Sequence, residues 1–395
     1  MFPLMMTLDV VMIPKYDKRV VFARADGISL PLVLHSMSPA TRIIQVGTVK
    51  FGGGLPIVLQ SMTATKTTDV QRTAETCQRL ADAGAGIVRI AVDTLRDAEA
   101  LREIRMKTTA NLSVDLQENY RLAEVVAPFV DKIRYNPGHL HHAEPELPWQ
   151  SKVERIVQIA RQYDCALRVG VNCGSLDPAN VDALTSALQH AEFIDSLGFD
   201  RYCVSIKSSD PRAVLEANRQ FAAERPDVPI HLGLTEAGLP PTGIEKSRVA
   251  LEPLLAGGIG DTLRVSLTVP NDRKTEELDA GRLILQNVAA GMIADIDVWQ
   301  PECVNIISCP SCARVENEHF INLAEQVRDA VQSVKTPMMI AVMGCRVNGP
   351  GETDHADIGL WCGTSLVNLK QGETLIGSFR YDEVIAKMME LIASR

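Results

Sequence analysis

The feature of this sequence that most constrains its fold is a regular alternation of short β-rich runs with amphipathic helical stretches. The alternation begins near residue 55, continues to about residue 295 and comprises about eight such pairs. A (β/α)8 barrel is closed by eight parallel strands, each followed by a helix, so the count matches this fold. The predicted strands are Ile57–Ser61, Ile87–Ala91, Leu112–Leu116, Lys132–Tyr135, Ala166–Val171, Tyr202–Ile206, Ile230–Leu234 and Thr262–Leu267.

An open, doubly wound sheet uses the same alternation, so periodicity alone does not separate the two architectures. An open sheet binds its ligand at one crevice, whereas a barrel uses the C-terminal ends of nearly all its strands. Nearly every predicted strand here ends in a polar or cationic side chain, which favours an α/β fold with a (β/α)8 TIM barrel. These side chains belong to Ser61, Thr63, Arg89, Asp93, Asp115, Gln117, Arg134, Asn136, Arg168, Asn172, Ser205, Lys207, Thr235, Glu236, Arg264 and Ser266.

The pattern changes beyond residue 300, which predicts a second, smaller α+β domain over residues 300–395. Residues 41–295 form the predicted barrel domain, and residues 1–40 fit neither unit and are predicted to be an N-terminal extension. The connection lacks a flexible Gly/Ser tract, so we expect the two domains at a fixed angle. The predicted elements of the second domain are strands near Val304–Ile307 and Met338–Met343, a helix near Asn317–Val334 and a last helix from Tyr381.

Composition excludes several classes of function. A formal net charge of −9 argues against a nucleic-acid-binding protein, because such proteins carry a basic surface. No run approaches the roughly 18 apolar residues that cross a bilayer, which predicts no membrane partner. Nine cysteines without a recognisable secretory signal are typical of a reducing compartment, so we expect a cytoplasmic protein.

The strongest single motif is Cys309–Cys312 (CPSC), followed by Cys345. Each cysteine comes just after a predicted strand, where a loop can present its sulfur. A C-x-x-C pair puts two sulfurs within reach of one metal centre, and a third ligand closes the site. Spacing alone leaves three hypotheses open: an iron–sulfur cluster, buried thiols without metal, and zinc with Cys362, His355 or His319 as its fourth ligand.

The segment Gly344–Glu352 (GCRVNGPGE) favours the cluster. Its glycines let the backbone come close to a bulky inorganic group, which suits a cluster better than one zinc ion. Glu352 lies seven positions beyond Cys345 and is predicted to place its carboxylate on the iron that three cysteines leave uncovered. That iron would then be exchangeable.

Taken together, these motifs resemble the 4-hydroxy-3-methylbut-2-enyl diphosphate synthase family in its two-domain bacterial form. The resemblance extends from about Arg42 to the C-terminus. The segments on which the resemblance is based are Pro56–Met62 (PIVLQSM), Arg134–Gly138 (RYNPG), Arg168–Asn172 (RVGVN), Ser205–Lys207 (SIK), His231–Gly238 (HLGLTEAG), Cys309–Cys312 (CPSC) and Gly344–Glu352 (GCRVNGPGE).

The resemblance implies a [4Fe-4S] cluster held by Cys309, Cys312, Cys345 and Glu352. It also implies a substrate, 2-C-methyl-D-erythritol 2,4-cyclodiphosphate, which is opened and reductively dehydroxylated with two electrons from a flavodoxin or ferredoxin. It further implies a head-to-tail homodimer, in which the cluster domain of one subunit caps the barrel of the other and closes about a hinge.

The residue types of the predicted barrel mouth suit such a substrate. Diphosphate oxygens are matched by planar, permanently charged donors, which the strand-end arginines supply, and Lys207 adds a point charge. Four or five buried cations without as many carboxylates are costly unless an anion arrives. The predicted substrate-binding residues are Arg89, Arg134, Asn136, Arg168, Asn172, Ser205, Lys207, His231, Thr235, Arg264 and Ser266.

Three carboxylates are predicted to be catalytic: Asp93, Glu236 and Glu352. Asp93, Asn172, Thr235 and Glu236 would orient hydroxyl groups, and Glu236 would also shuttle a proton during loss of water. The structural alternative is that strand-end Asp, Asn and Thr side chains cap the following helix.

Two other functions compete with this prediction. One is a pterin-type barrel synthase with a structural zinc domain, and the other is an electron-carrying iron–sulfur protein. Several motifs are discounted: two glycine runs, 52–54 and 257–260, as turns, three histidines as part of a solvated loop, and five cysteines as core residues. These histidines and cysteines are His139, His141, His142, Cys77, Cys165, Cys203, Cys303 and Cys362, and Cys173 remains open.

Overall fold

The computed structural model describes residues 41–176, 182–299, 303–315 and 317–394, together with the backbone of three N-terminal strands. Those strands form an antiparallel sheet within the region predicted as an extension: β1 (Thr7–Ile13), β2 (Lys18–Ala25) and β3 (Ile28–Leu34).

Eight parallel strands follow, in the spatial order β11-β10-β9-β8-β7-β6-β13-β12. A parallel bridge between Val204 and Ile230 joins the two ends of this order, so the sheet closes on itself. The TIM barrel is therefore confirmed and the open sheet is excluded. The strands are β6 (Val58–Met62), β7 (Ile87–Val92), β8 (Leu112–Leu116), β9 (Lys132–Tyr135), β10 (Ala166–Asn172), β11 (Tyr202–Lys207), β12 (His231–Leu232) and β13 (Thr262–Leu263).

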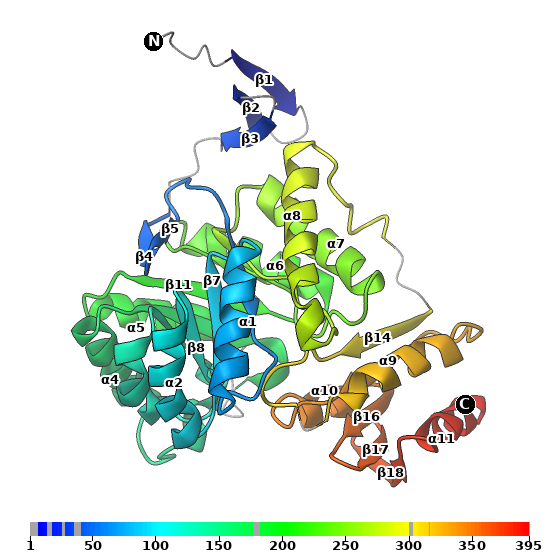
Figure 1. The fold of residues 1–395 in the computed structure, drawn as a ribbon. Coiled ribbons are helices and arrows are strands. Elements are labelled where there is room, and N and C mark those ends of the chain that lie inside the picture. The colour runs from blue at the N-terminus through cyan, green and yellow to red at the C-terminus, as the bar shows by residue number, and fades with distance from the viewer. Residues whose placement is uncertain are drawn as a thin grey trace.

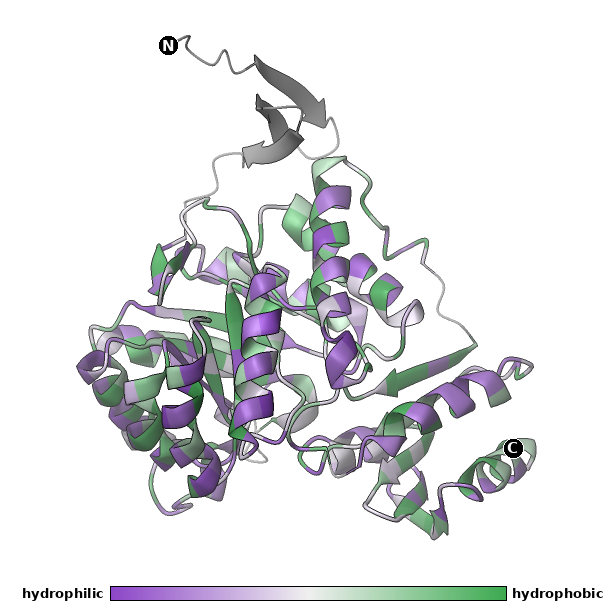
Figure 2. Ribbon diagram, in the orientation of Figure 1, coloured by the Kyte–Doolittle hydropathy of each residue, from purple (hydrophilic) through white to green (hydrophobic). Residues whose placement is uncertain are grey.

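Helices surround these strands, as Figure 1 shows. Strand β7 is buried along its whole length, as expected for a strand covered on both faces, while α1 shows a largely hydrophilic outer face in Figure 2. Local signals begin these helices, for example the capping box that Thr94 forms with Asp97. The helices are α1 (Val70–Asp82), α2 (Leu95–Lys107), α3 (Ala123–Val126), α4 (Trp149–Gln162), α5 (Ala183–Ser196), α6 (Pro211–Glu224), α7 (Thr242–Ala256) and α8 (Thr275–Ala289).

The last two barrel strands are shorter than predicted. Strand β12 ends at Leu232 rather than Leu234, and β13 ends at Leu263 rather than Leu267. Beyond β12 the backbone turns sharply, and Glu236 has a positive φ of 47°. The loops that follow these two short strands therefore carry four of the predicted site residues to the barrel mouth: Thr235, Glu236, Arg264 and Ser266.

A short hairpin closes the N-terminal end of the barrel. It consists of β4 (Ile44–Val46) and β5 (Val49–Phe51), and its apolar side chains form a buried cluster with three residues of the strands above it. The cluster comprises Ile44, Val46, Phe51, Ile87, Ala166 and Cys203. The interior is consequently reached from the opposite end, where the strands terminate.

The C-terminal domain contains a five-stranded sheet in the order β14-β15-β16-β17-β18. The predicted strands β14 and β15 are confirmed, as are the two predicted helices, whereas α10 and the strands β16, β17 and β18 were not predicted. The elements are β14 (Val304–Ser308), α9 (His319–Ala330), β15 (Met338–Met343), α10 (Gly349–His355), β16 (Ile358–Cys362), β17 (Leu366–Gln371), β18 (Thr374–Arg380) and α11 (Val384–Ala393).

This domain lies on the barrel of its own chain, at the end away from β4 and β5 (Figure 1). Ser308, at the end of β14, forms a parallel bridge with Ala237, and the Thr268 hydroxyl lies 2.6 Å from the Ser308 hydroxyl. Lys66 donates to the carbonyl oxygens of Ala313 (2.9 Å) and Val315 (2.7 Å). The structure thus brings the two domains of one chain into contact.

Candidate active site

A cavity lies between the barrel mouth and the C-terminal domain. Most of the predicted barrel residues line it, and so do the three cysteines of the predicted cluster site. The lining residues are Met62, Arg89, Asp115, Gln117, Arg134, Arg168, Val171, Asn172, Ser205, Lys207, Thr235, Glu236, Arg264, Ser266, Cys309, Pro310, Cys312, Arg314, Cys345, Val347 and Asn348.

The barrel side of the cavity carries five buried cations, and three of them have nitrogen atoms without a hydrogen-bonding partner among the described residues. Arg168 is 1% exposed and donates to the Ser205 hydroxyl (2.5 Å), but its Nε and Nη2 have no partner among the described residues. The Nε atoms of Arg134 and Arg264 are likewise unpartnered in that part of the chain. Arg89 points its Nη2 at the Met62 sulfur (3.0 Å), a weak acceptor. Such donors fit an anion with several oxygens.

Few carboxylates balance these cations. Asp115 contacts Arg134 (2.5 Å), Arg314 (3.2 Å) and Arg89 (4.0 Å), and despite its burial the arginines hold the pKa of this carboxyl well below its usual range. Glu277 pairs with Arg264 (3.4 Å) and Lys274 (2.9 Å).

Burial and the excess of positive charge in the cavity lower the pKa values of several of the buried cations. Burial and the Arg134 charge lower the pKa of Arg168 to about 9, and burial and neighbouring arginines lower the pKa of Lys207 as well. A bound dianion would relieve this repulsion.

Two glycines make room for the cations inside the barrel. A Cβ on Gly170 would lie 2.2 Å from the Arg134 Nε, and one on Gly233 would lie 2.5 Å from the Lys207 Nζ. Both contacts are shorter than any real Cβ contact. The glycines in RVGVN and HLGL therefore serve side-chain packing, because a larger residue would displace a cation from the cavity.

The C-terminal domain contributes three thiols to the cavity. Cys309 and Cys345 are buried, and Cys312 is partly buried. The hydrogen bond with Cys345 lowers the pKa of Cys312 to about 6, with the Arg314 charge acting in the same direction, so this sulfur is favoured as a thiolate ligand. The predicted fourth ligand, Glu352, does not line the cavity. Its carboxylate lies against Gly174, and burial together with the Glu236 charge raises its pKa to about 8.

A preformed zinc site is not present at these cysteines. Sulfurs about 2.3 Å from a tetrahedral zinc lie about 3.8 Å apart. Among the described residues, no group of three potential ligands that includes a cysteine lies within 4.8 Å of one another. Of the proposed fourth zinc ligands, Cys362 is buried in the domain core, His355 is exposed and His319 stacks against Tyr381.

Glu236 connects the two sides of the cavity. It is 2% exposed, its Oε1 accepts a hydrogen bond from the Asn348 side chain (3.0 Å), and its Oε2 has no partner in the described part of the chain. Burial raises the pKa of Glu236, which favours the protonated form. A carboxyl group with a raised pKa can give a proton to a reacting group and, once ionised, can take one back.

Three other predicted residues lie outside the cavity lining. The Asp93 carboxylate forms ion pairs with Arg314 (2.8 Å) and Arg346 (3.1 Å) of the C-terminal domain, so it takes part in a contact between the domains. Asn136 caps the η3 turn (Pro137–His142) by accepting from Gly138 (3.2 Å), which is the structural alternative considered for strand-end residues. His231 lies beneath the cavity, 3.2 Å from the Lys207 Nζ, and supports that cation.

Sequence reasoning missed two residues on the C-terminal side. Arg314 and Asn348 both line the cavity and both contact barrel carboxylates. Arg314 comes two positions after Cys312, and Asn348 lies within the GCRVNGPGE segment, so proximity to the cysteine motifs was the available signal.

Two interpretations of discounted residues were wrong. His139 was expected in a solvated loop, yet it is 7% exposed, because η3 folds its side chain inward. Cys303 was expected in the core, yet it is exposed, because it precedes β14. Cys77, Cys165, Cys203 and Cys362 are buried as predicted, and Cys173 is partly buried.

No helix of the described residues is long and apolar enough to cross a membrane. Comparison with known proteins matches residues 41–282 to the GcpE TIM-barrel domain and residues 305–394 to the GcpE protein C-terminal domain.

Several curated relatives are similar over nearly the whole chain. The 4-hydroxy-3-methylbut-2-en-1-yl diphosphate synthase (flavodoxin) of Rhodopirellula baltica is 55% identical over 361 residues, which cover 89% of this chain and 94% of that protein. The protein of the same name from Persephonella marina is 38% identical over 366 residues, or 89% and 97% of the two chains. Among solved structures, the dihydropteroate synthase of Yersinia pestis is 12% identical with a TM-score of 0.44, covering 62% of this chain and 98% of that one. The match of both domains and the identity to these relatives show that the chain belongs to the GcpE family.

Proposed function

We propose that this protein is a 4-hydroxy-3-methylbut-2-enyl diphosphate synthase that opens and reductively dehydroxylates 2-C-methyl-D-erythritol 2,4-cyclodiphosphate. The observation that carries the proposal is the shared cavity, in which cations with unfilled hydrogen-bonding capacity face three cysteines. The alternative barrel synthase with a zinc domain is not favoured, because the family model also matches the C-terminal domain.

We propose a [4Fe-4S] cluster as the cofactor, held by Cys309, Cys312 and Cys345 with Glu352 as the fourth ligand. The support is that all three thiols face the same cavity. Bound there, the cluster would supply the electrons and a Lewis-acidic iron for cleavage of a carbon–oxygen bond. The glutamate ligand would require Glu352 to turn from Gly174 toward the cysteines.

The residues of the chain have separable tasks in this reaction. The planar guanidinium groups of Arg89, Arg134, Arg168 and Arg264 bind the diphosphate oxygens, with Lys207 as a point charge. Glu236 is placed to exchange a proton with a substrate oxygen, since its Oε2 faces no other partner in the described residues. Asn172 and Thr235 orient hydroxyl groups at the rim of the same cavity. Capping by the C-terminal domain restricts water, which strengthens these electrostatic contacts.

Partners and location follow from the family. The relatives' name includes flavodoxin, and we propose flavodoxin or ferredoxin as the electron donor, in the cytoplasm. A homodimer is proposed from the family resemblance. Within it, the single-chain cavity described above would give each subunit a complete site.

The test is anaerobic purification with iron and sulfide analysis, followed by an assay of the cyclic diphosphate with reduced flavodoxin. We expect about four irons and four sulfides per chain and turnover to the linear diphosphate. Cys345→Ser should lose the cluster and activity, Arg168→Met should keep the cluster and lose substrate affinity, and the matched control Cys303→Ser should retain both. A cluster-loaded protein that neither binds nor converts the cyclic diphosphate would refute the proposal.

A further inference from the structure

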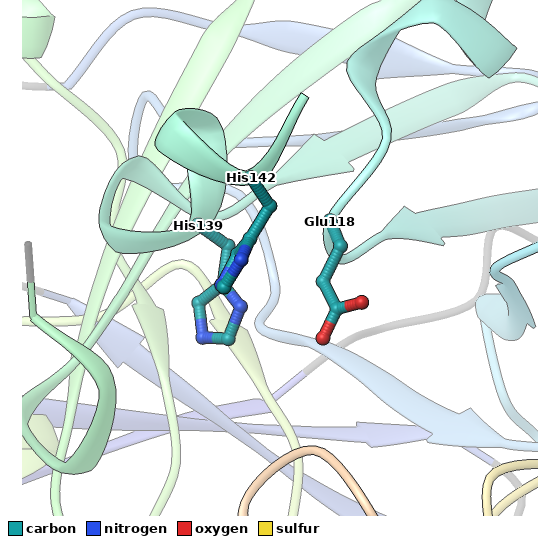
Figure 3. A group of neighbouring side chains, drawn as sticks. All are labelled: Glu118, His139 and His142. Atoms are coloured by element: carbon teal, nitrogen blue, oxygen red, sulfur yellow. The ribbon is translucent and has the colours of Figure 1, made fainter. Parts of the chain in front are cut away.

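A second group of potential metal ligands lies at the barrel mouth, apart from the cysteines. It combines Glu118, in the loop after β8, with His139 and His142 of the η3 turn after β9 (Figure 3). One ligand atom from each residue lies within 4.8 Å of the other two. No other group of this kind occurs in the parts of the chain that the structure describes.

We propose that Glu118, His139 and His142 form a binding site for a divalent transition metal of the zinc type, with a position left open for water. The residues belong to adjacent βα loops, and the two histidines stand three positions apart on one short helical turn. Two imidazoles and a carboxylate select zinc and its first-row neighbours over magnesium or calcium, which prefer oxygen ligands alone.

An independent observation is the state of His139. This side chain is 7% exposed, yet its Nδ1 has no hydrogen-bonding partner among the described residues. A buried ring nitrogen without a partner costs free energy comparable to a lost hydrogen bond. Figure 3 shows its ring beside that of His142, with the Glu118 carboxylate on the same side of the turn. A metal ion would satisfy the histidines together.

Geometry and charge are compatible with an ion. Ligand atoms about 2.0–2.1 Å from a tetrahedral zinc lie about 3.4 Å apart, whereas these atoms lie within 4.8 Å of one another, so side-chain rotations must shorten their separations by about 1.4 Å at most. Arg134 and Arg314 already contact Asp115, at 2.5 and 3.2 Å. Within the described residues Glu118 forms no ion pair, so its carboxylate is available to a metal.

The site would tie together the two loops that flank the anion-binding residues. Gln117, next to Glu118, accepts a hydrogen bond from Arg134 (2.6 Å), and Asn136 caps the turn that carries the histidines. An ion that binds the native state but not the unfolded chain also stabilises the native state, which raises Tm.

The experiment is a zinc titration of the full-length, cluster-loaded protein against a chromophoric chelator, with iron and sulfide measured in the same samples. We expect one zinc per chain in addition to the intact cluster, and a higher Tm when zinc is added. Glu118→Gln and His142→Ala should each weaken zinc binding at least about tenfold, since removing even an outer partner of a metal ligand costs about 10–100-fold. His319→Asn, which changes an exposed histidine of the C-terminal domain, should bind zinc as the wild type does.

Iron and sulfide contents distinguish this site from zinc that replaces the cluster at the cysteines. Unchanged Tm values of the zinc-free variants would show that the substitutions leave the fold intact. The proposal is overturned if cluster-loaded wild type takes up no zinc, or if Glu118→Gln and His142→Ala bind it with wild-type affinity.

Discussion

Arg314 of the C-terminal domain donates from Nε to both carboxylate oxygens of Asp93, at 2.9 and 3.0 Å, although 221 residues separate them in the chain. The same guanidinium reaches Asp115 with Nη1 (3.2 Å) and its carbonyl oxygen with Nη2 (3.0 Å). Arg314 is 8% exposed, so these contacts form a buried polar link between the two domains. The link places Asp93 in domain docking, whereas the sequence predicted a catalytic role.

The first prediction concerns this link. Arg314→Ala should destabilise the protein by about 1.5–3 kcal/mol, because it removes hydrogen bonds between charged groups, although Asp115 keeps Arg134 and Asp93 keeps Arg346 as partners. In a double-mutant cycle with Asp93→Asn, urea unfolding should show strong coupling, since the second substitution removes a contact that the first has already broken. A docking role leaves the pH profile of kcat unchanged in Asp93→Asn. A shifted pH profile with additive stability effects would instead restore Asp93 as a catalytic residue.

The second prediction concerns the uncompensated cations. Arg168→Met should stabilise the substrate-free protein or leave it unchanged, because it removes a buried charge repelled by Arg134. The same substitution should weaken binding of the cyclic diphosphate about 10- to 100-fold, since a hydrogen bond between charged groups contributes about 1.5–3 kcal/mol.

Isothermal titration and thermal unfolding, with and without substrate, would measure both effects of Arg168→Met. Arg161→Met, which removes an exposed arginine on α4, is the matched control. Equal substrate affinity of the two variants would contradict an anion site at Arg168.

The third prediction concerns pH and His190. This histidine is 5% exposed, its Nδ1 lies 3.0 Å from the Tyr135 hydroxyl, and burial lowers its pKa to about 3. Its unfolded pKa is about 6.5, so between pH 3 and 6.5 the unfolded state binds one more proton than the native state. Stability contributed by the neutral ring is therefore present above pH 6.5 and is lost as pH falls toward 3.

The slope from this one residue is about 1.4 kcal/mol per pH unit. Urea unfolding of the wild type at pH 4–6 should show it, and His190→Gln should reduce the slope by that amount. The exposed His355 offers the control, because His355→Gln should leave the slope as it is in the wild type. A slope that His190→Gln does not change would mean that the ring is not buried in the neutral form.

The fourth prediction concerns which chain completes the cavity. Arg168→Met removes an anion-binding residue of the barrel, and Cys345→Ser removes a predicted cluster ligand of the C-terminal domain. Because both residues line one cavity in one chain, a mixture of the two inactive variants should stay inactive after unfolding and refolding together. Recovery of activity in the mixture would show that the C-terminal domain of one subunit caps the barrel of another.

The sequence by itself determined the order and number of the barrel strands, because alternating hydrophobic periodicity is a local property of the chain. It also determined which side chains reach the barrel mouth, since the ends of parallel strands in a barrel meet at one face. Arg89, Arg134, Arg168, Arg264 and Lys207 all line the cavity as a consequence.

Tertiary structure decided what those side chains contact. Asp93 meets Arg314, Glu236 meets Asn348 and His139 is turned inward toward Glu118, and none of these arrangements follows from spacing along the chain. Each depends on how a loop or a domain docks, and docking is governed by packing and charge between segments that can be far apart in sequence. Local patterns therefore predicted most of the barrel residues that line the cavity, while long-range packing decided which residues they contact.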